Sequence, residues 1–182
     1  MSATLTLTHS FYTAPLLETG RLVLRPDQPT DLAPFVAMWA EPDFHRHLGG
    51  KPITEEEAWA KLLRNAGLWP VLGFGYWAME EKSSGRFIGQ VGFADFQRAI
   101  DPSLKGVPEI GWVLAPAVHG RGYATEAVRA VLAWGDAHFA PARTVCLIDP
   151  ENRASLRVAE KCGYRLLART TYKEQPILVL AR

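Results

Sequence analysis

The residues with the clearest capacity for chemistry lie between positions 108 and 126, which read PEIGWVLAPAVHGRGYATE. An apolar run breaks there into a loop with Gly120 and Gly122, and an amphipathic run begins directly afterwards. Because glycine has no Cβ atom, the loop can adopt positive φ angles and bring successive backbone N–H groups close to an anion. A helix that starts at this point adds the unpaired N–H groups of its first turn and the positive end of its dipole. The segment therefore predicts a binding site for a phosphate compound.

A second set of polar residues lies in the segment 149–164, which reads DPENRASLRVAEKCGY. Asn152, Ser155 and Ala159 are spaced i, i+3 and i+7, so a helix places all three along one face. Two interpretations stay open for the polar pair. Either Asn152 and Ser155 contact a ligand, or Asn152 caps the first turn and Ser155 is a tolerated helix serine.

The elements that position these residues begin with a short strand at 22–25. An amphipathic helix follows, with apolar positions at Leu32, Phe35, Val36 and Trp39. A second helix begins after Thr54, because Thr54 and Glu57 have the spacing of a capping box. Residues 75–80 and 87–93 then predict two antiparallel strands joined by a short polar turn.

The second half of the chain predicts a strand, helix and strand around the glycine loop. The strand at 107–114 feeds the loop, the helix runs from Ala124 to about His138, and the next strand covers 144–148. A crossover of this kind joins parallel strands and is right-handed.

A further helix is predicted with Asp149 as its N-cap, Pro150 at its first position and Gly163 just past its end. The chain closes with two strands at 165–172 and 177–180, around a turn that holds Gln175 and Pro176. This order of elements predicts a mixed α+β sheet in a single domain that covers residues 1–182.

Composition limits the classes of partner and compartment. The net charge of +1 gives no electrostatic reason to expect nucleic acid or a membrane as a partner. Residues 1–10 lack the basic and apolar regions of a secretory signal, so we expect a cytoplasmic protein. Cys146 and Cys162 have no metal-ligand spacing and are expected to be reduced packing residues.

Three separated motifs together resemble the GNAT acetyltransferases, and more narrowly their Rim-type branch, which acetylates the N-termini of ribosomal proteins. The motifs are LETGRLVLR at 17–25, the glycine loop, and the 151–164 segment that ends in Cys162-Gly163-Tyr164. The family pattern Q/R-x-x-G-x-G/A corresponds to His119-Gly-Arg-Gly-Tyr-Ala124, with histidine in the first place. The resemblance covers about residues 16–181.

The resemblance implies the GNAT fold, a mostly antiparallel sheet of about seven strands, flanked by about four helices. Two parallel strands in it splay apart into a V that holds acetyl-coenzyme A, the co-substrate, without a metal. The pyrophosphate would lie on the backbone of His119, Gly120, Arg121, Gly122, Tyr123, Ala124 and Thr125. The pantetheine arm would pair with Trp112, Val113 and Leu114, and would contact Asn152 and Ser155.

The implied reaction is direct transfer of the acetyl group to a primary amine in a ternary complex. The amine would belong to a protein N-terminus or a small molecule. A backbone N–H near Leu114 would polarise the thioester carbonyl, and Ser155 would contact the departing thiolate. Many relatives carry a tyrosine acid where this chain has Ala159. Glu109 is the family-like base, with an exposed or salt-bridged carboxylate as its alternative. No covalent intermediate is expected.

The resemblance places the loop with His45 and His47 near the acceptor pocket, whereas two histidines without further ligands do not predict a metal site. A homodimer is the family-like oligomeric state. The alternative function is a catalytically weak sensor or interaction module that binds coenzyme A. A dinucleotide oxidoreductase is disfavoured, because Thr125 stands where a third fingerprint glycine would be and repeated βαβ units are absent.

Overall fold

The computed structural model of the chain describes residues 13–139 and 143–182, and the expectation about residues 1–10 lies outside this range. Eight strands form one sheet in the order β1-β2-β3-β4-β5-β6-β8-β7. Their bounds are Leu17–Glu18 (β1), Leu22–Arg25 (β2), Tyr76–Glu81 (β3), Arg86–Ala94 (β4), Glu109–Leu114 (β5), Val145–Ile148 (β6), Arg165–Tyr172 (β7) and Gln175–Ala181 (β8). Every neighbouring pair is antiparallel except β5 and β6, which are parallel.

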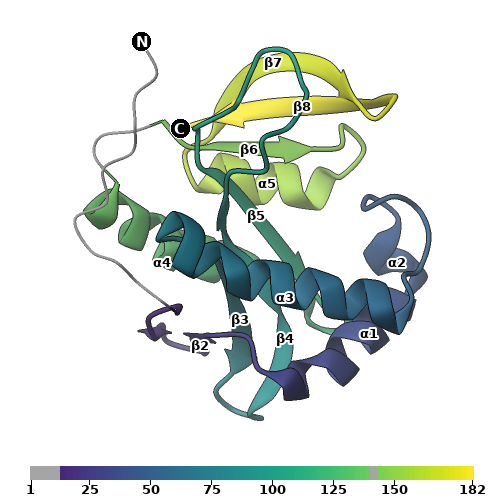
Figure 1. Cartoon of the computed structure of the whole chain (residues 1–182), viewed down its shortest axis with the longest axis vertical. Coiled ribbons are helices and arrows are strands. Elements are labelled where there is room, and N and C mark those ends of the chain that lie inside the picture. The colour runs from purple at the N-terminus through teal and green to yellow at the C-terminus, as the bar shows by residue number, and fades with distance from the viewer. Residues whose placement is uncertain (1–12, 140–142) are drawn as a thin grey trace.

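Helices cover both faces of the sheet. Their bounds are Leu32–Ala40 (α1), Pro42–His45 (α2), Glu55–Leu72 (α3), Tyr123–His138 (α4) and Arg153–Lys161 (α5). Figure 1 shows α3 crossing in front of the central strands, with α4 behind it. One hydrophobic core joins Trp77 and Val91 of the sheet to Val128 and Val131 of α4, whereas a second joins Phe35 of α1 to residues of α2 and α3.

The parallel strands β5 and β6 share a single register pair, Glu109 with Val145, where the Val145 N–H donates to the Pro108 carbonyl at 3.0 Å. Beyond this pair, β6 remains paired with β8 as far as Ile148, and β5 remains paired with β4 as far as Leu114. The two strands therefore diverge, and the predicted α+β fold with a V-shaped splay is confirmed. The sheet has one strand more than expected, the two-residue β1, and α2 is a short additional helix.

Two local predictions were wrong. The helix α5 begins at Arg153 with Asn152 as its N-cap, whereas the Asp149 carboxylate accepts the Glu151 N–H ahead of the helix and contacts His47. The turn between β7 and β8 consists of Lys173 and Glu174, both at positive φ, as a two-residue type I′ connection requires. The capping box is confirmed: the Glu57 N–H donates to Thr54 Oγ1 at 3.1 Å, and the Thr54 N–H donates to the Glu57 carboxylate at 2.8 Å.

Cys146 and Cys162 are buried free thiols, and burial raises the pKa of both. Among residues 13–139 and 143–182, no cluster of three or more histidine, cysteine, aspartate or glutamate side chains is arranged to hold a metal ion. The same residues include no helix with the length and apolar character needed to cross a bilayer.

Candidate active site

A groove of about 920 Å³ opens where β5 and β6 diverge. Its walls come from four parts of the chain: α2 with the loop that follows it, the end of β5, the glycine loop with the first turn of α4, and α5 with its approach. The lining residues are Asp43, Phe44, Arg46, His47, Leu48, Trp112, Val113, Leu114, Pro116, Val118, His119, Gly120, Gly122, Tyr123, Ala124, Thr125, Glu151, Asn152, Arg153, Ala154, Ser155, Arg157, Val158 and Lys161.

The glycine loop has the backbone conformation that the sequence predicts. Gly120 and Gly122 have φ angles of 74° and 83°, in the left-handed region. Gly122 is the N-cap of α4 and has no side chain to accept a hydrogen bond from the first turn. The first-turn N–H groups therefore stay available at the wall of the groove, where the helix dipole favours an anion.

Two residues of the 17–25 motif, Thr19 and Arg21, form hydrogen bonds to the glycine loop or to the start of α4. The Arg21 guanidinium donates to the Arg121 carbonyl at 2.9 Å and to the Glu126 carboxylate of α4 at 2.7 Å. The Thr19 hydroxyl donates to the same carboxylate at 2.6 Å. Burial alone would raise the pKa of Glu126, but these donors outweigh it and lower that pKa. The sequence displays the motif at 17–25, but it does not predict that this motif contacts the glycine loop.

The Arg121 side chain does not line the groove. Its guanidinium lies 3.5 Å from the Glu81 carboxylate, which also accepts a hydrogen bond from the Tyr123 hydroxyl. Arg21 and Arg121 both lie over the Tyr123 ring, at 4.3 and 5.2 Å from its centroid. The other residues predicted to bind the cofactor all line the groove.

The edge of β5 that faces the groove is left without a strand partner. The Ala115 N–H donates to the Ile88 carbonyl at 2.9 Å, and antiparallel alternation then turns the amides of Trp112 and Leu114 away from β4. Among the described residues, β6 pairs with β5 only at Glu109 and Val145. The Leu114 carbonyl accepts a hydrogen bond from His119 Nε2 at 2.8 Å. The Leu114 amide therefore remains as a donor at the groove.

On α5, the structure supports the capping interpretation of Asn152, since its Oδ1 accepts the Ser155 N–H at 3.0 Å. Ser155 lines the groove, and its hydroxyl has no hydrogen-bond partner within the described ranges. Ala159 does not line the groove: it is fully buried in the main core. The alanine methyl group cannot act as the acid.

Glu109 lies outside the groove. Its carboxylate is buried and accepts two hydrogen bonds from Arg98, at 2.7 and 2.8 Å. Burial would lower the pKa of Arg98, but the carboxylate beside it raises that pKa. The structure thus shows the salt-bridged carboxylate that the sequence left as the alternative for Glu109.

Two further features of the groove were not predicted from the sequence: the row of cations on α5 and the contact between His47 and Asp149. Arg153, Arg157 and Lys161 line it at i, i+4 and i+8 on α5, a spacing that the sequence does display. His47 also lines it, with Nδ1 at 2.6 Å from Asp149 Oδ2. These two residues are 102 positions apart, so no local pattern could have paired them.

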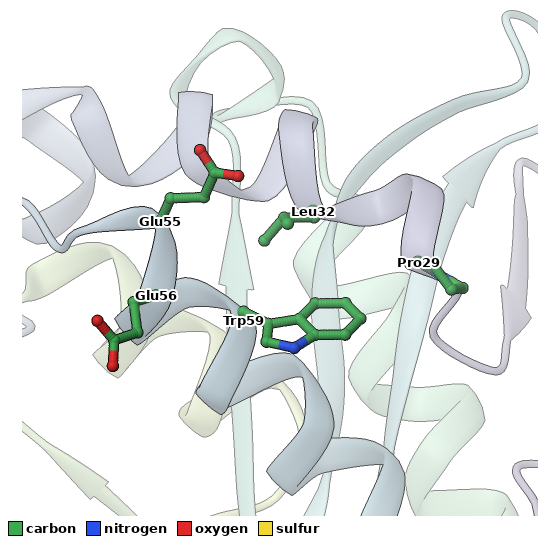
Figure 2. Close-up of a pocket in the computed structure, with 5 residues that line it drawn as sticks. All are labelled: Pro29, Leu32, Glu55, Glu56 and Trp59. Atoms are coloured by element: carbon green, nitrogen blue, oxygen red, sulfur yellow. The ribbon is translucent and has the colours of Figure 1, made fainter.

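A second pocket, of about 500 Å³, lies between the start of α1 and the start of α3, and none of the predicted site residues lines it. Its lining residues are Pro29, Leu32, Glu55, Glu56 and Trp59. Figure 2 shows the carboxylates of Glu55 and Glu56 pointing in different directions, away from the Trp59 indole. The pocket has no convergent polar groups, so the groove is the candidate active site.

Comparison with known proteins agrees with this geometry. Residues 21–165 match the model of the acetyltransferase (GNAT) domain family. The uncharacterised protein YkkB of Bacillus subtilis (strain 168) is 33% identical over 91% of this chain and 94% of its own length. A Bordetella pertussis protein described as a GnaT-family acetyltransferase has a structure similar to this one, with a TM-score of 0.82 and 33% identity over 93% of this chain and 99% of that one. RimL, an alpha-N-protein acetyltransferase solved in complex with coenzyme A, shares the fold at a TM-score of 0.73, with 16% identity over 92% of this chain and 97% of its own.

A splayed sheet with a glycine loop at its open edge and a groove along the free strand defines an acyltransferase that uses a coenzyme A thioester. The chain belongs to the GNAT acetyltransferase family. It is therefore an acetyl-coenzyme A-dependent acyltransferase.

Proposed function

We propose that this protein transfers the acetyl group of acetyl-coenzyme A directly to a primary amine, within a ternary complex and in a single domain that covers residues 1–182. The observation that carries the proposal is the convergence of three features on one groove. These are the left-handed glycine loop, the unpaired edge of β5 and the free hydroxyl of Ser155.

The cofactor contacts follow from these features. The pyrophosphate lies against the backbone from His119 to Thr125, and the pantetheine arm pairs with the amides of Trp112 and Leu114. Four cations that line the groove complement the phosphates, namely Arg46, Arg153, Arg157 and Lys161. The coenzyme A bound in the RimL structure supports the assignment of this ligand to the groove.

The chemistry uses the amine of the acceptor as the nucleophile and needs no covalent enzyme intermediate. The Leu114 N–H stabilises the oxyanion that forms when the amine attacks the thioester carbonyl. The Ser155 hydroxyl donates to the departing thiolate, since Ala159 supplies no acid. Glu109 does not take the amine proton in this proposal, because its carboxylate would first have to lose two hydrogen bonds from Arg98.

The acceptor is proposed to be a protein N-terminus or a small-molecule amine of the cytoplasm, with the Rim-type enzymes as the model. A family-like homodimer is part of the same proposal. Neither a nucleic acid nor a membrane is included as a partner, in keeping with the net charge of +1.

The test is release of free thiol from acetyl-coenzyme A by the purified protein, against N-terminal peptides, polyamines, amino acids and aminoglycosides. We expect turnover with one of these amine classes, and mass spectrometry of the product should show a single added acetyl group. Binding of coenzyme A in calorimetry without turnover on any acceptor would contradict the transferase proposal. That result would favour the alternative, a sensor or interaction module that binds coenzyme A.

A further inference from the structure

The loop that follows α2 and the end of β6 meet at one contact in the groove. Nδ1 of His47 lies 2.6 Å from Oδ2 of Asp149, and both side chains are partly buried, at 23% and 31% exposure. Asp149 directly follows β6, at the open end of the V. The His47 imidazole lines the same groove as the free edge of β5 and Ser155.

The Asp149 carboxylate is fixed on both oxygens. Oδ2 faces His47, while Oδ1 accepts the Glu151 N–H at 2.8 Å. Burial alone would raise the pKa of Asp149, but the Glu151 N–H and His47 outweigh it and lower that pKa. The group is thus an ionised acceptor at neutral pH, without a proton to donate.

This fixes the tautomer of the histidine. A carboxylate can only accept a hydrogen bond, so the proton between the two groups belongs to Nδ1 of His47. In the neutral ring Nε2 then carries a lone pair. Nε2 has no hydrogen-bond partner among residues 13–139 and 143–182, and His47 lines the groove.

We propose that His47 accepts the proton of the attacking amine and that Asp149 positions its ring and stabilises the resulting imidazolium. This inference rests on the proposed acetyl transfer. His47 is the catalytic residue of the pair, because it lines the groove that the proposed acceptor enters, and Asp149 is a positioning residue that acts through it.

Nε2 of His47 takes one proton from the acceptor ammonium, and the free amine then attacks the thioester carbonyl, so a C–N bond forms. Collapse of the tetrahedral intermediate breaks the C–S bond and releases the coenzyme A thiolate. The imidazolium returns its proton to the thiolate sulfur, and the N-protonated amide, a strong acid, loses its remaining extra proton to water. Coenzyme A thiol, the acetylated amine and one proton are the products.

Other ionisable groups line the groove around His47. Asp43 and Arg46 belong to its own segment, and Arg46 pairs with Asp43 at 2.7 Å. The facing elements contribute His119 and Tyr123 from the glycine loop, and Glu151, Arg153, Arg157 and Lys161 from α5 and its approach. His119 already uses Nε2 to hold the Leu114 carbonyl. His119 therefore keeps the lone pair of its neutral ring on Nδ1, and His47 differs from it in its partner, a carboxylate that stabilises the imidazolium formed by a base.

The test compares the pH dependence of acetyl transfer in the wild type and in His47→Gln, with the acceptor that the amine panel identifies. At pH 7 we expect kcat/KM for the acceptor to fall about 100-fold, the low end of what general base catalysis contributes. The ratio of wild type to variant should shrink toward one as pH approaches the acceptor's own pKa, about 8 for an α-amino group and about 10.4 for lysine. A free amine no longer needs the base. Coenzyme A affinity should stay within about twofold.

A merely structural contact gives a different result. If His47 only tethers the loop, the loss in His47→Gln is the same at every pH, and that result would overturn the inference. Lys51→Gln is the matched control, because Lys51 is an exposed residue a few positions further along the same segment and does not line the groove. It should retain the wild-type pH profile.

The variant Asp149→Asn is the second part of this test. Its amide can keep the bond to the Glu151 N–H but would donate to Nδ1, which moves the ring proton to Nε2 and removes the base. We expect a loss of similar size, and the double variant should be no slower than His47→Gln alone. Additive losses would overturn the pairing. If the wild type binds coenzyme A yet acetylates no acceptor, the proposed function and this inference fall together; a pH-independent ratio removes the inference alone.

Discussion

At the scale of single residues, the candidate site depends on two glycines in the left-handed backbone conformation. Gly120 and Gly122 adopt φ angles of 74° and 83°, and the ideal Cβ of Gly120 would meet no atom within 4 Å. The requirement for glycine at Gly120 is therefore conformational and not steric. It follows that a substitution there changes the shape of the backbone cradle without a clash elsewhere.

Gly120→Ala should weaken coenzyme A binding, because alanine disfavours the left-handed conformation by about 1–2 kcal/mol. Gly85→Ala is the matched control: Gly85 has a φ of 66°, open space around its Cβ position, and lies in the β3–β4 turn away from the groove. Thermal unfolding should show similar destabilisation of both variants. Calorimetry should show weaker binding for Gly120→Ala alone, and equal affinities would remove the cradle from the site.

Ser155→Ala should slow turnover by about tenfold or more at saturating substrate, because the departing thiolate would lose a hydrogen bond worth about 1.5–3 kcal/mol. Coenzyme A affinity should be nearly unchanged, since the hydroxyl matters only when charge develops on sulfur. Ser103→Ala, in the exposed loop before β5, is the control and should behave as the wild type. Wild-type rates for Ser155→Ala would remove this residue as a thiolate partner.

At the scale of elements, the β1–β2 segment acts on the site from outside it. Arg21 donates both to the Arg121 carbonyl in the glycine loop and to Glu126 at the start of α4. This ties the first strands to the glycine loop and to the start of α4. The side chain is 47% exposed, so the ion pair itself contributes little to global stability.

Arg21→Gln should therefore affect binding more than folding. We expect the free energy of unfolding to change by less than about 1 kcal/mol, since the pair is exposed. Coenzyme A affinity should fall roughly threefold to tenfold as the loop loses its external support. Lys82→Gln, which loses an exposed pair with Glu18 of the same strand region, should leave affinity unchanged. Faster amide exchange confined to residues 120–125 would locate the effect, and unchanged exchange there would contradict it.

Elements that depend on local spacing were predictable. The capping box at Thr54, the hairpin of β3 and β4, and the helix after Gly122 each follow from neighbouring residues, and the structure confirms them. The start of α5 was not predictable in this way, because Asp149 and Asn152 are both good N-cap residues and the local sequence does not distinguish them.

The residues of the candidate site also fall into those that the sequence could predict and those that it could not. The glycine loop and the β5 edge lie on contiguous sequence, so their place in the groove could be predicted. Partners that lie far apart along the chain could not. Tertiary packing sets three such contacts: Glu109 with Arg98, Arg21 with the Arg121 carbonyl, and His47 with Asp149.

At the scale of the whole molecule, a buried polar chain ties three regions together. Asn65 of α3 donates to Gln90 of β4 at 3.0 Å, and Gln90 donates to Asp27, after β2, at 2.7 Å. Oδ2 of Asp27 is buried and has no hydrogen-bond partner among the described residues. Burial raises the pKa of Asp27 to about 7, with Asp31 adding to the rise and with Gln90 and Arg25 opposing it.

This carboxyl makes stability depend on pH. An acid whose pKa is raised by folding binds more protons in the folded state, so the free energy of unfolding falls as pH rises between the two pKa values, from about 4 to about 7. Asp27→Asn is neutral throughout and should lose this slope. Denaturant unfolding at pH 5 and pH 8 should show the variant gaining roughly 1–3 kcal/mol on the wild type across that interval. Glu160→Gln, at an exposed position of α5, should track the wild type. Parallel curves for Asp27→Asn and the wild type would mean that the Asp27 carboxyl is already ionised at pH 5, and that the chain from Asn65 to Asp27 holds a charge.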